Sequence, residues 1–144
     1  MNSKQQVQEG SATGIRRILE RGGRIRVEAA FVTGVVAEYY GVSGEELSGP
    51  GRTQEVCFAR HAVMYVLRTV SGANLPAIGR AVGRDHTTVL HGISRMEQMV
   101  GESPAVRREI ELLSTTCRRR IEAAASAEVL RCRSAWQPPA RSRR

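Results

Sequence analysis

The sequence has few aromatic residues, few cysteines and a single lysine among its 144 residues. Phe, Trp and Tyr together make up 4% of the chain, which is too little for a large aromatic-lined ligand pocket. Cys57, Cys117 and Cys132 are odd in number and lie far apart, so the sequence predicts no disulfide framework and fits a reducing compartment.

Long apolar segments are also missing. A membrane-spanning helix needs about 18 or more consecutive apolar residues, and the sequence contains no such run. The first residues, MNSKQQVQEGSAT, are polar and contain no apolar core of a signal peptide. We therefore expect a cytoplasmic protein that makes no contact with a membrane.

Positive charge is in clear excess. Lys and Arg number 22 against 14 Asp and Glu, giving a net charge of +8; Lys4 is the one lysine, so the other 21 are arginines. A basic chain of this size most often binds a polyanion, and the arginine fork matches phosphate oxygens and guanine edges. Codon usage in a GC-rich genome explains the preference for arginine over lysine equally well, but it does not explain the excess of positive charge.

Apolar residues recur at helical spacing along most of the chain, which predicts an all-α fold without strands. Helices are expected over 14–22, 27–40, 55–71, 75–82, 86–100 and 104–130, with a short capped turn at 43–47. The expected organisation is a flexible tail (1–13), a main domain (14–102), a C-terminal helical extension (103–130) and a basic disordered tail (131–144).

Residues 74–99 have the pattern of a helix-turn-helix. Asn74 is suited to cap a short helix with Pro76 in its first turn, Gly83 to form a tight turn, and Asp85 to cap the second helix. The apolar stripe of that second helix consists of Val89, Ile93, Met96 and Val100. The alternative is an ordinary helical hairpin in which these residues only cap.

The outer face of the second helix favours DNA binding. Its side chains are short and polar, which lets a helix enter the major groove, and His86, Thr87 and Thr88 lie in the first turn, where base contacts usually occur. The N-terminus of the helix also favours a phosphate group.

The segment GRDHTTVLHGISRMEQ at 83–98 resembles the signature of the DNA-binding domain (domain IV) of the bacterial replication initiator DnaA. VAEYYGVSGEEL at 36–47, GRTQEVCFARHAVMYVLR at 51–68 and NLPAIGRAVGRDHTTV at 74–89 are similar to the family in the same order. The resemblance implies a trihelical helix-turn-helix domain, here followed by an additional C-terminal helix. It also implies sequence-specific binding of double-stranded DNA at a DnaA-box-like site, regulation of replication initiation or transcription, and association with the nucleoid.

The resemblance also places DNA contacts on this sequence. Arg52 corresponds to a basic-loop arginine that enters the minor groove, Arg60 to an arginine of the long helix, and Arg68 to a phosphate-contacting position. His61 stands at a position where the family usually has glutamine. Positions that contact the DNA backbone are Pro76, Arg84 and Thr88, and those that contact bases are Asp85, His86, Thr87 and Leu90.

These residue types suit base recognition. An Asp85 carboxylate can accept a hydrogen bond from a cytosine amino group, and His86 can hydrogen-bond a base edge. The Thr87 methyl group and Leu90 can pack on thymine methyl groups.

Other chemistry is poorly supported by the sequence. A phosphate-binding loop needs Lys and Ser/Thr after its second glycine, but Pro50 and Gly51 follow Gly49, so we expect neither ATPase activity nor any enzymatic activity or cofactor. Cys57 and His61, four residues apart, are either two metal ligands or a packed cysteine beside a surface histidine. Cys117, followed by three arginines, is either a thiol of lowered pKa or a small core residue.

A second functional class remains open. The apolar stripe and alanine-rich end of the helix at 104–130 would suit a protein-interaction module, through a protein partner or self-association, with vestigial or non-specific DNA binding. The arginines at 118–120 and 131–144 either grip flanking phosphates or form a solvated basic face.

Overall fold

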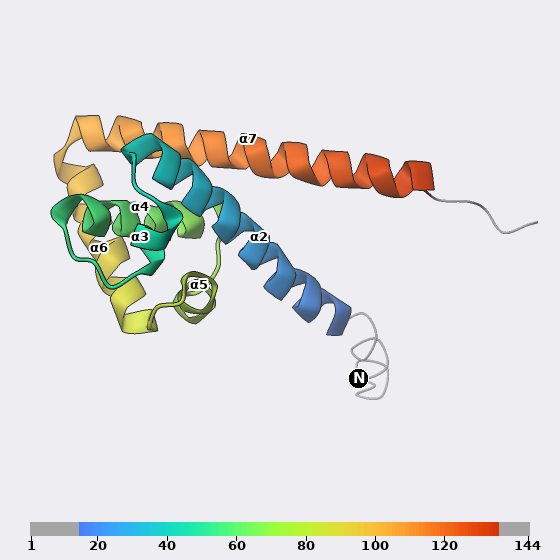
Figure 1. Ribbon diagram of the computed structural model, residues 1–144, viewed down its shortest axis with the longest axis horizontal. Coiled ribbons are helices and arrows are strands. Elements are labelled where there is room, and N and C mark those ends of the chain that lie inside the picture. Colours follow the sequence, from blue (N-terminus) through green and yellow to red (C-terminus); the bar gives the residue numbers. More distant parts are fainter. Residues whose placement is uncertain (1–14, 136–144) are drawn as a thin grey trace, which may run out of the picture.

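The computed structural model describes residues 15–135, with side chains from 24 to 135 apart from residue 132. This part of the chain forms six α-helices and no strand, which confirms the predicted all-α fold (Figure 1). The helices are α2 (Ile15–Tyr40), α3 (Gly44–Ser48), α4 (Gln54–Ser71), α5 (Leu75–Val82), α6 (His86–Glu102) and α7 (Pro104–Ala135). None of them is long and apolar enough to cross a membrane. The expected tail at 1–13 lies outside the described residues.

Helix α4 is the centre of the packing. It lies against α2, α6 and α7, and α5 packs against α6 and α2. Burying one aliphatic side chain completely stabilises the fold by about 1.5–3 kcal/mol. The largest fully buried side chains come from five of the six helices: Val32, Val36, Val66, Leu67, Ile78, Val89, Met96, Leu113 and Cys117.

The first helix differs from the prediction. A break was expected at Gly22-Gly23, but α2 is one helix from Ile15 to Tyr40. A glycine inside a helix costs about 1 kcal/mol relative to alanine, which the flanking turns can offset, whereas only proline both removes a donor and clashes. The actual end lies at Gly41, whose φ of 67° is the left-handed conformation that glycine tolerates best.

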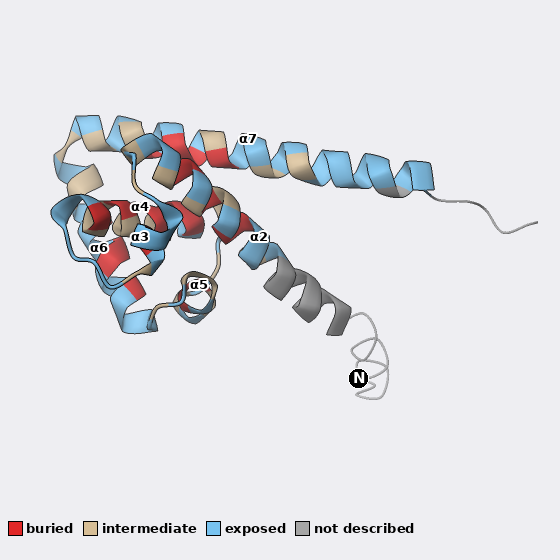
Figure 2. Ribbon diagram, in the orientation of Figure 1, coloured by how far each residue is buried: buried red, intermediate tan, exposed pale blue. Residues whose placement is uncertain are grey.

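The C-terminal helix is in part a core element. Ile110, Leu113 and Cys117 of α7 are buried against α2, α4 and α6, so the core continues past the expected boundary at 102. The helix also continues to Ala135, five residues beyond its expected end at 130, so residues 131–135 of the expected disordered tail are helical; the rest of that tail, 136–144, lies outside the described residues. From Ala125 onward every described side chain is exposed, and this part of α7 projects from the rest of the molecule (Figures 1 and 2).

Candidate nucleic-acid interface

Helices α5 and α6 are joined by a tight turn. Asn74 caps α5 through a hydrogen bond from the Ala77 backbone N–H at 3.0 Å, and Gly83 ends the helix with φ 69°. The Arg84 N–H then donates to the Gly79 carbonyl oxygen at 2.9 Å. A Cβ atom at Gly79 would lie 2.6 Å from the Arg84 carbonyl oxygen, so only glycine allows this close approach.

Asp85 caps α6, as predicted. Its carboxylate accepts a hydrogen bond from the Thr87 N–H at 3.3 Å and a second from the Thr87 hydroxyl, while His86 Nδ1 lies 3.4 Å from the other carboxylate oxygen. The hydrogen bonds from Thr87 hold the pKa of Asp85 below its usual value. Because its hydroxyl serves the cap, Thr87 offers mainly its methyl group to a ligand.

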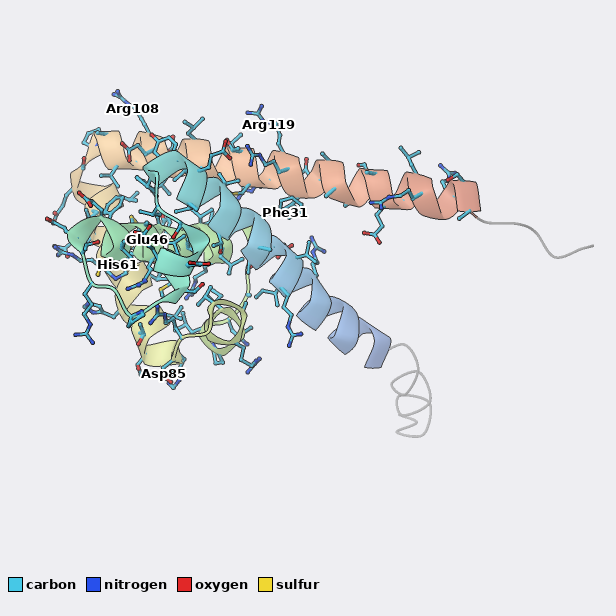
Figure 3. The ribbon with its side chains drawn as sticks, viewed as in Figure 1. Phe31, Glu46, His61, Asp85, Arg108 and Arg119 are labelled. Carbon is cyan, nitrogen blue, oxygen red and sulfur yellow. The ribbon has the colours of Figure 1, made fainter. Side chains whose placement is uncertain are left out.

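The start of α6 and its cap present most of the residues that were expected to contact DNA. Asp85, His86, Thr87 and Thr88 are exposed, and so is Pro76 on α5. Leu90 stands out among them because a large apolar side chain is 50% exposed on an otherwise polar face. Figure 3 places Asp85 on the opposite side of the packed helices from Arg108 and Arg119 on α7.

Arg60 is not free at the surface. Its Nε donates to the Leu47 carbonyl at 2.9 Å, its Nη2 donates to the Glu46 and Gly49 carbonyls at 2.7 and 2.5 Å, and its Nη1 donates to the Gly51 carbonyl. Partial burial, followed by the neighbouring Arg84 cation, lowers the pKa of Arg60. The guanidinium therefore binds backbone carbonyls at the end of α3 and in the loop that joins α3 to α4.

Arg84 binds the same loop from the helix-turn-helix. Its Nη2 donates to the Gly49 carbonyl at 2.7 Å and lies 3.3 and 3.4 Å from the carbonyl oxygens of Ser48 and Leu47. The turn before α6 is thus attached to the loop before α4, although 35 residues separate Arg84 from Gly49. Neither Arg60 nor Arg84 was expected to bind carbonyl groups of the protein's own backbone. No local sequence pattern marks these carbonyls, because they come together only when the chain folds.

Arg52 and Arg68 are exposed, which leaves both guanidinium groups accessible to an anion. Three further basic residues of the helix-turn-helix are exposed although the sequence did not single them out as contacts: Arg80 on α5, and His91 and Arg95 on α6. Exposed arginines on the outer faces of α5 and α6 are the signal that could have found two of them.

His61 on α4 faces His91 on α6. Their rings are 6.1 Å apart, edge to face, where Gly92 lets the helices approach closely: a Cβ there would lie 2.8 Å from Met64 Sδ. Burial lowers the pKa of His61, and the positive or ionisable neighbours His91, Arg95 and Arg60 lower it further. His61 is half-buried and so offers DNA less surface than its neighbours on α6.

The two cysteines for which alternatives were left open differ in burial. Within the described residues no group of three or more His, Cys, Asp or Glu side chains could hold a metal ion, and Cys57 is half-buried. Cys117 is fully buried, and that burial raises the pKa of its thiol to about 11, outweighing the effect of Arg120. Cys117 is therefore a small core residue.

A capped helix, a glycine turn and a second helix with an exposed N-terminal face define a DNA-binding domain of the helix-turn-helix class. Residues 30–96 match the family described as the bacterial dnaA protein helix-turn-helix. This part of the chain therefore resembles the helix-turn-helix domain of bacterial DnaA proteins.

Two similar proteins agree with this assignment. Over 106 residues, 74% of this chain, the sequence is 33% identical to the chromosomal replication initiator protein DnaA of Mycobacteroides abscessus. A crystal structure of a DNA replication initiation factor superposes with a TM-score of 0.69 at 26% identity, covering 82% of this chain and 36% of that one. The present chain spans about a fifth (22%) of the length of the mycobacterial relative.

Proposed function

We propose that this protein binds double-stranded DNA sequence-specifically, at a site resembling the DnaA box, and thereby regulates replication initiation or transcription without ATPase activity. The observation that carries the proposal is the exposed face at the start of α6, where Leu90 is 50% exposed among polar side chains. Burial of that face in a major groove would remove the exposed apolar surface from water.

Discrimination between bases would come from the residues at the start of α6. The Leu90 side chain and the Thr87 methyl group suit thymine methyl groups. The Asp85 carboxylate, which the cap keeps ionised, suits a cytosine amino group, and exposed His86 suits a base edge.

Affinity would come mainly from cations around this face. Arg52 at the basic loop, Arg68 at the end of α4 and the free nitrogens of Arg84 would neutralise phosphates, and Arg80 and Arg95 extend the same charge. Pro76 and Thr88 would contact the sugar-phosphate backbone beside them. Contacts of this kind position the protein, whereas the α6 contacts select the sequence.

The test compares two leucines of equal exposure. Leu90 on α6 is 50% exposed and Leu112 on α7 is 52% exposed, so alanine at either site removes a similar surface side chain. Covering the exposed half of a leucine contributes about 1 kcal/mol, or about fivefold in affinity. Leu90→Ala should therefore lower the preference for a box duplex over a scrambled duplex about fivefold, and Leu112→Ala should leave it unchanged.

Fluorescence anisotropy at two salt concentrations measures the preference for the box duplex and the salt dependence of the affinity. The logarithm of the affinity should fall with a slope of about 0.9 for each neutralised phosphate. Equal affinity of the unmodified chain for the box and the scrambled duplex would refute sequence-specific binding, and an unchanged preference after Leu90→Ala would refute the assigned face.

A second candidate function is favoured by the free part of α7. Val129 and Leu130 are 57% and 65% exposed on the projecting segment of that helix. A helical segment as short as 125–135 is only marginally stable in water by itself, so a protein partner or a second copy would stabilise it. Sedimentation over a range of concentrations tests self-association, and a monomer at every concentration would remove the second copy as the partner.

A further inference from the structure

The end of α3 and the loop between α3 and α4 are held by hydrogen bonds from one arginine side chain. Glu46, Leu47, Gly49 and Gly51 all direct backbone carbonyls at the single guanidinium group of Arg60. A guanidinium has five N–H groups, so these four carbonyls leave Arg60 one N–H for any other partner.

A second arginine closes the arrangement. Arg84 donates from Nη2 alone, to Gly49 at 2.7 Å with Ser48 and Leu47 farther away, so its Nε and Nη1 stay available to a phosphate. Arg84 directly precedes Asp85, the cap of α6. The carbonyl clasp, meaning Arg60, Arg84 and the carbonyls at 46–51 that they bind, thus joins α4, the loop and the start of α6.

We propose that Arg60 is a positioning residue that contributes to DNA binding through Arg52 rather than through a phosphate contact of its own. This inference rests on the proposed function, because it assumes that Arg52 contacts DNA. Arg52 follows Gly51, whose carbonyl Arg60 binds, so the clasp fixes the backbone directly before the Arg52 side chain.

The composition of the loop explains why it needs such a clasp. Gly49, Pro50 and Gly51 form no regular structure, and glycine loses more conformational freedom on ordering than any other residue. A loop ordered before DNA arrives spares the complex that entropic cost.

A direct phosphate contact by Arg60 conflicts with the same geometry. Bidentate binding of phosphate uses two N–H groups, and Arg60 has one left. Lysine separates the two roles, because it keeps the charge and binds phosphate well but cannot span four carbonyls with a planar fork.

The experiment measures box-duplex affinity for Arg60→Lys, Arg60→Gln, Arg52→Ala and the double variants, with exposed Arg119→Lys on α7 as the matched control. The clasp predicts that Arg60→Lys loses as much affinity as Arg60→Gln. It also predicts that adding either change to Arg52→Ala lowers affinity by less than about twofold, since both act through one contact. Arg119→Lys should bind like the unmodified chain.

The contrary result is equally definite. Retained affinity in Arg60→Lys, additive losses with Arg52→Ala, or a salt slope that falls by about 0.9 when Arg60→Gln is added to Arg52→Ala would each show that Arg60 itself neutralises a phosphate. Any of these outcomes overturns the inference.

A measurement on the unmodified chain covers the case in which the variants fail to fold. The Arg60 Nε–Hε group should give a slowly exchanging NMR resonance in the free protein, unmoved by box DNA, because Leu47 already accepts its hydrogen bond. A rapidly exchanging resonance that becomes protected only with DNA would overturn the clasp. Equal binding to box and scrambled duplexes would instead refute the proposed function while leaving the free-protein resonance to decide the clasp.

Discussion

Gly79 sets the geometry of the helix-turn-helix, and replacing it with alanine tests how tightly the turn is built. A Cβ at this position would lie 2.6 Å from the Arg84 carbonyl oxygen and 3.5 Å from the His86 nitrogen. Both neighbours are backbone atoms, so no side chain can rotate away to make room. The turn itself must move.

The expected change in the free energy of unfolding combines one stabilising and two destabilising contributions. Alanine favours a helix over glycine by about 1 kcal/mol. Forcing an extra carbon into a closely packed site costs about 1–3 kcal/mol. Displacing the Arg84 carbonyl also weakens the hydrogen bond from the Arg84 N–H to Gly79, at a cost of about 0.5–1.5 kcal/mol. The net result for Gly79→Ala is a destabilisation of about 0.5–3.5 kcal/mol.

Gly34 supplies a control of the same chemistry and opposite sign. It lies within α2 and is exposed, and a Cβ added there would have no neighbour within 4 Å, so Gly34→Ala should stabilise the protein by up to about 1 kcal/mol. Thermal unfolding followed by circular dichroism measures both variants. In a chain of this size about 4 °C in Tm corresponds to 1 kcal/mol, which predicts a fall of about 2–14 °C for Gly79→Ala and a rise of up to about 4 °C for Gly34→Ala.

Equal Tm values for the two variants would refute this account of the turn. An intact Tm together with lost DNA affinity in Gly79→Ala would mean that the turn moves at little energetic cost. Retained DNA affinity beside an intact Tm would instead mean that the orientation of α6 is set by its contacts with α4 and not by Gly79.

Two further predictions concern pH and the C-terminal helix. The folded pKa of His61 lies below the unfolded value near 6.5, so the unfolded state binds more protons at this residue and the free energy of unfolding should fall as pH drops from about 7 through 6.5. His61→Gln should reduce this pH dependence in urea titrations. An unchanged pH dependence in His61→Gln would contradict the assignment to His61. Deleting residues 125–144 should change the free energy of unfolding by less than about 1 kcal/mol, because the described side chains from 125 onward are exposed. A chain ending at 112 should lose cooperative unfolding, because Leu113 and Cys117 are removed from the core. A large fall in the free energy of unfolding on deleting only 125–144 would show that the projecting part of the helix is packed.

The sequence predicted the features whose causes are local. The caps at Asn74 and Asp85, the turn at Gly83 and the capping box of Ser43 with Glu46 were all found where expected. At each cap a side chain satisfies backbone groups within three residues, and at Gly83 the turn needs only a glycine with positive φ, so a short pattern contains the whole interaction.

Features that depend on contacts between distant segments were not predictable in the same way. Arg60 was assigned to DNA by resemblance, but its partners are carbonyls 9 to 14 residues earlier that converge only after the loop has folded. The pairing of His61 with His91 likewise requires the packing of α4 on α6. Helix α7 appeared to be an extension because nothing in its stripe shows which helices would cover Leu113.

The acceptors bound by Arg60 and Arg84 are main-chain oxygens, which every amino acid possesses. Substitutions at the exposed positions Ser48 and Pro50 can therefore change the chemistry that this segment shows to a groove without removing its anchorage. A different loop of equal length could therefore be introduced between α3 and α4, with Arg60 and Arg84 retained to hold its backbone. In such a variant the sequence preference in the minor groove of DNA could be altered while α6 keeps its position for the major groove.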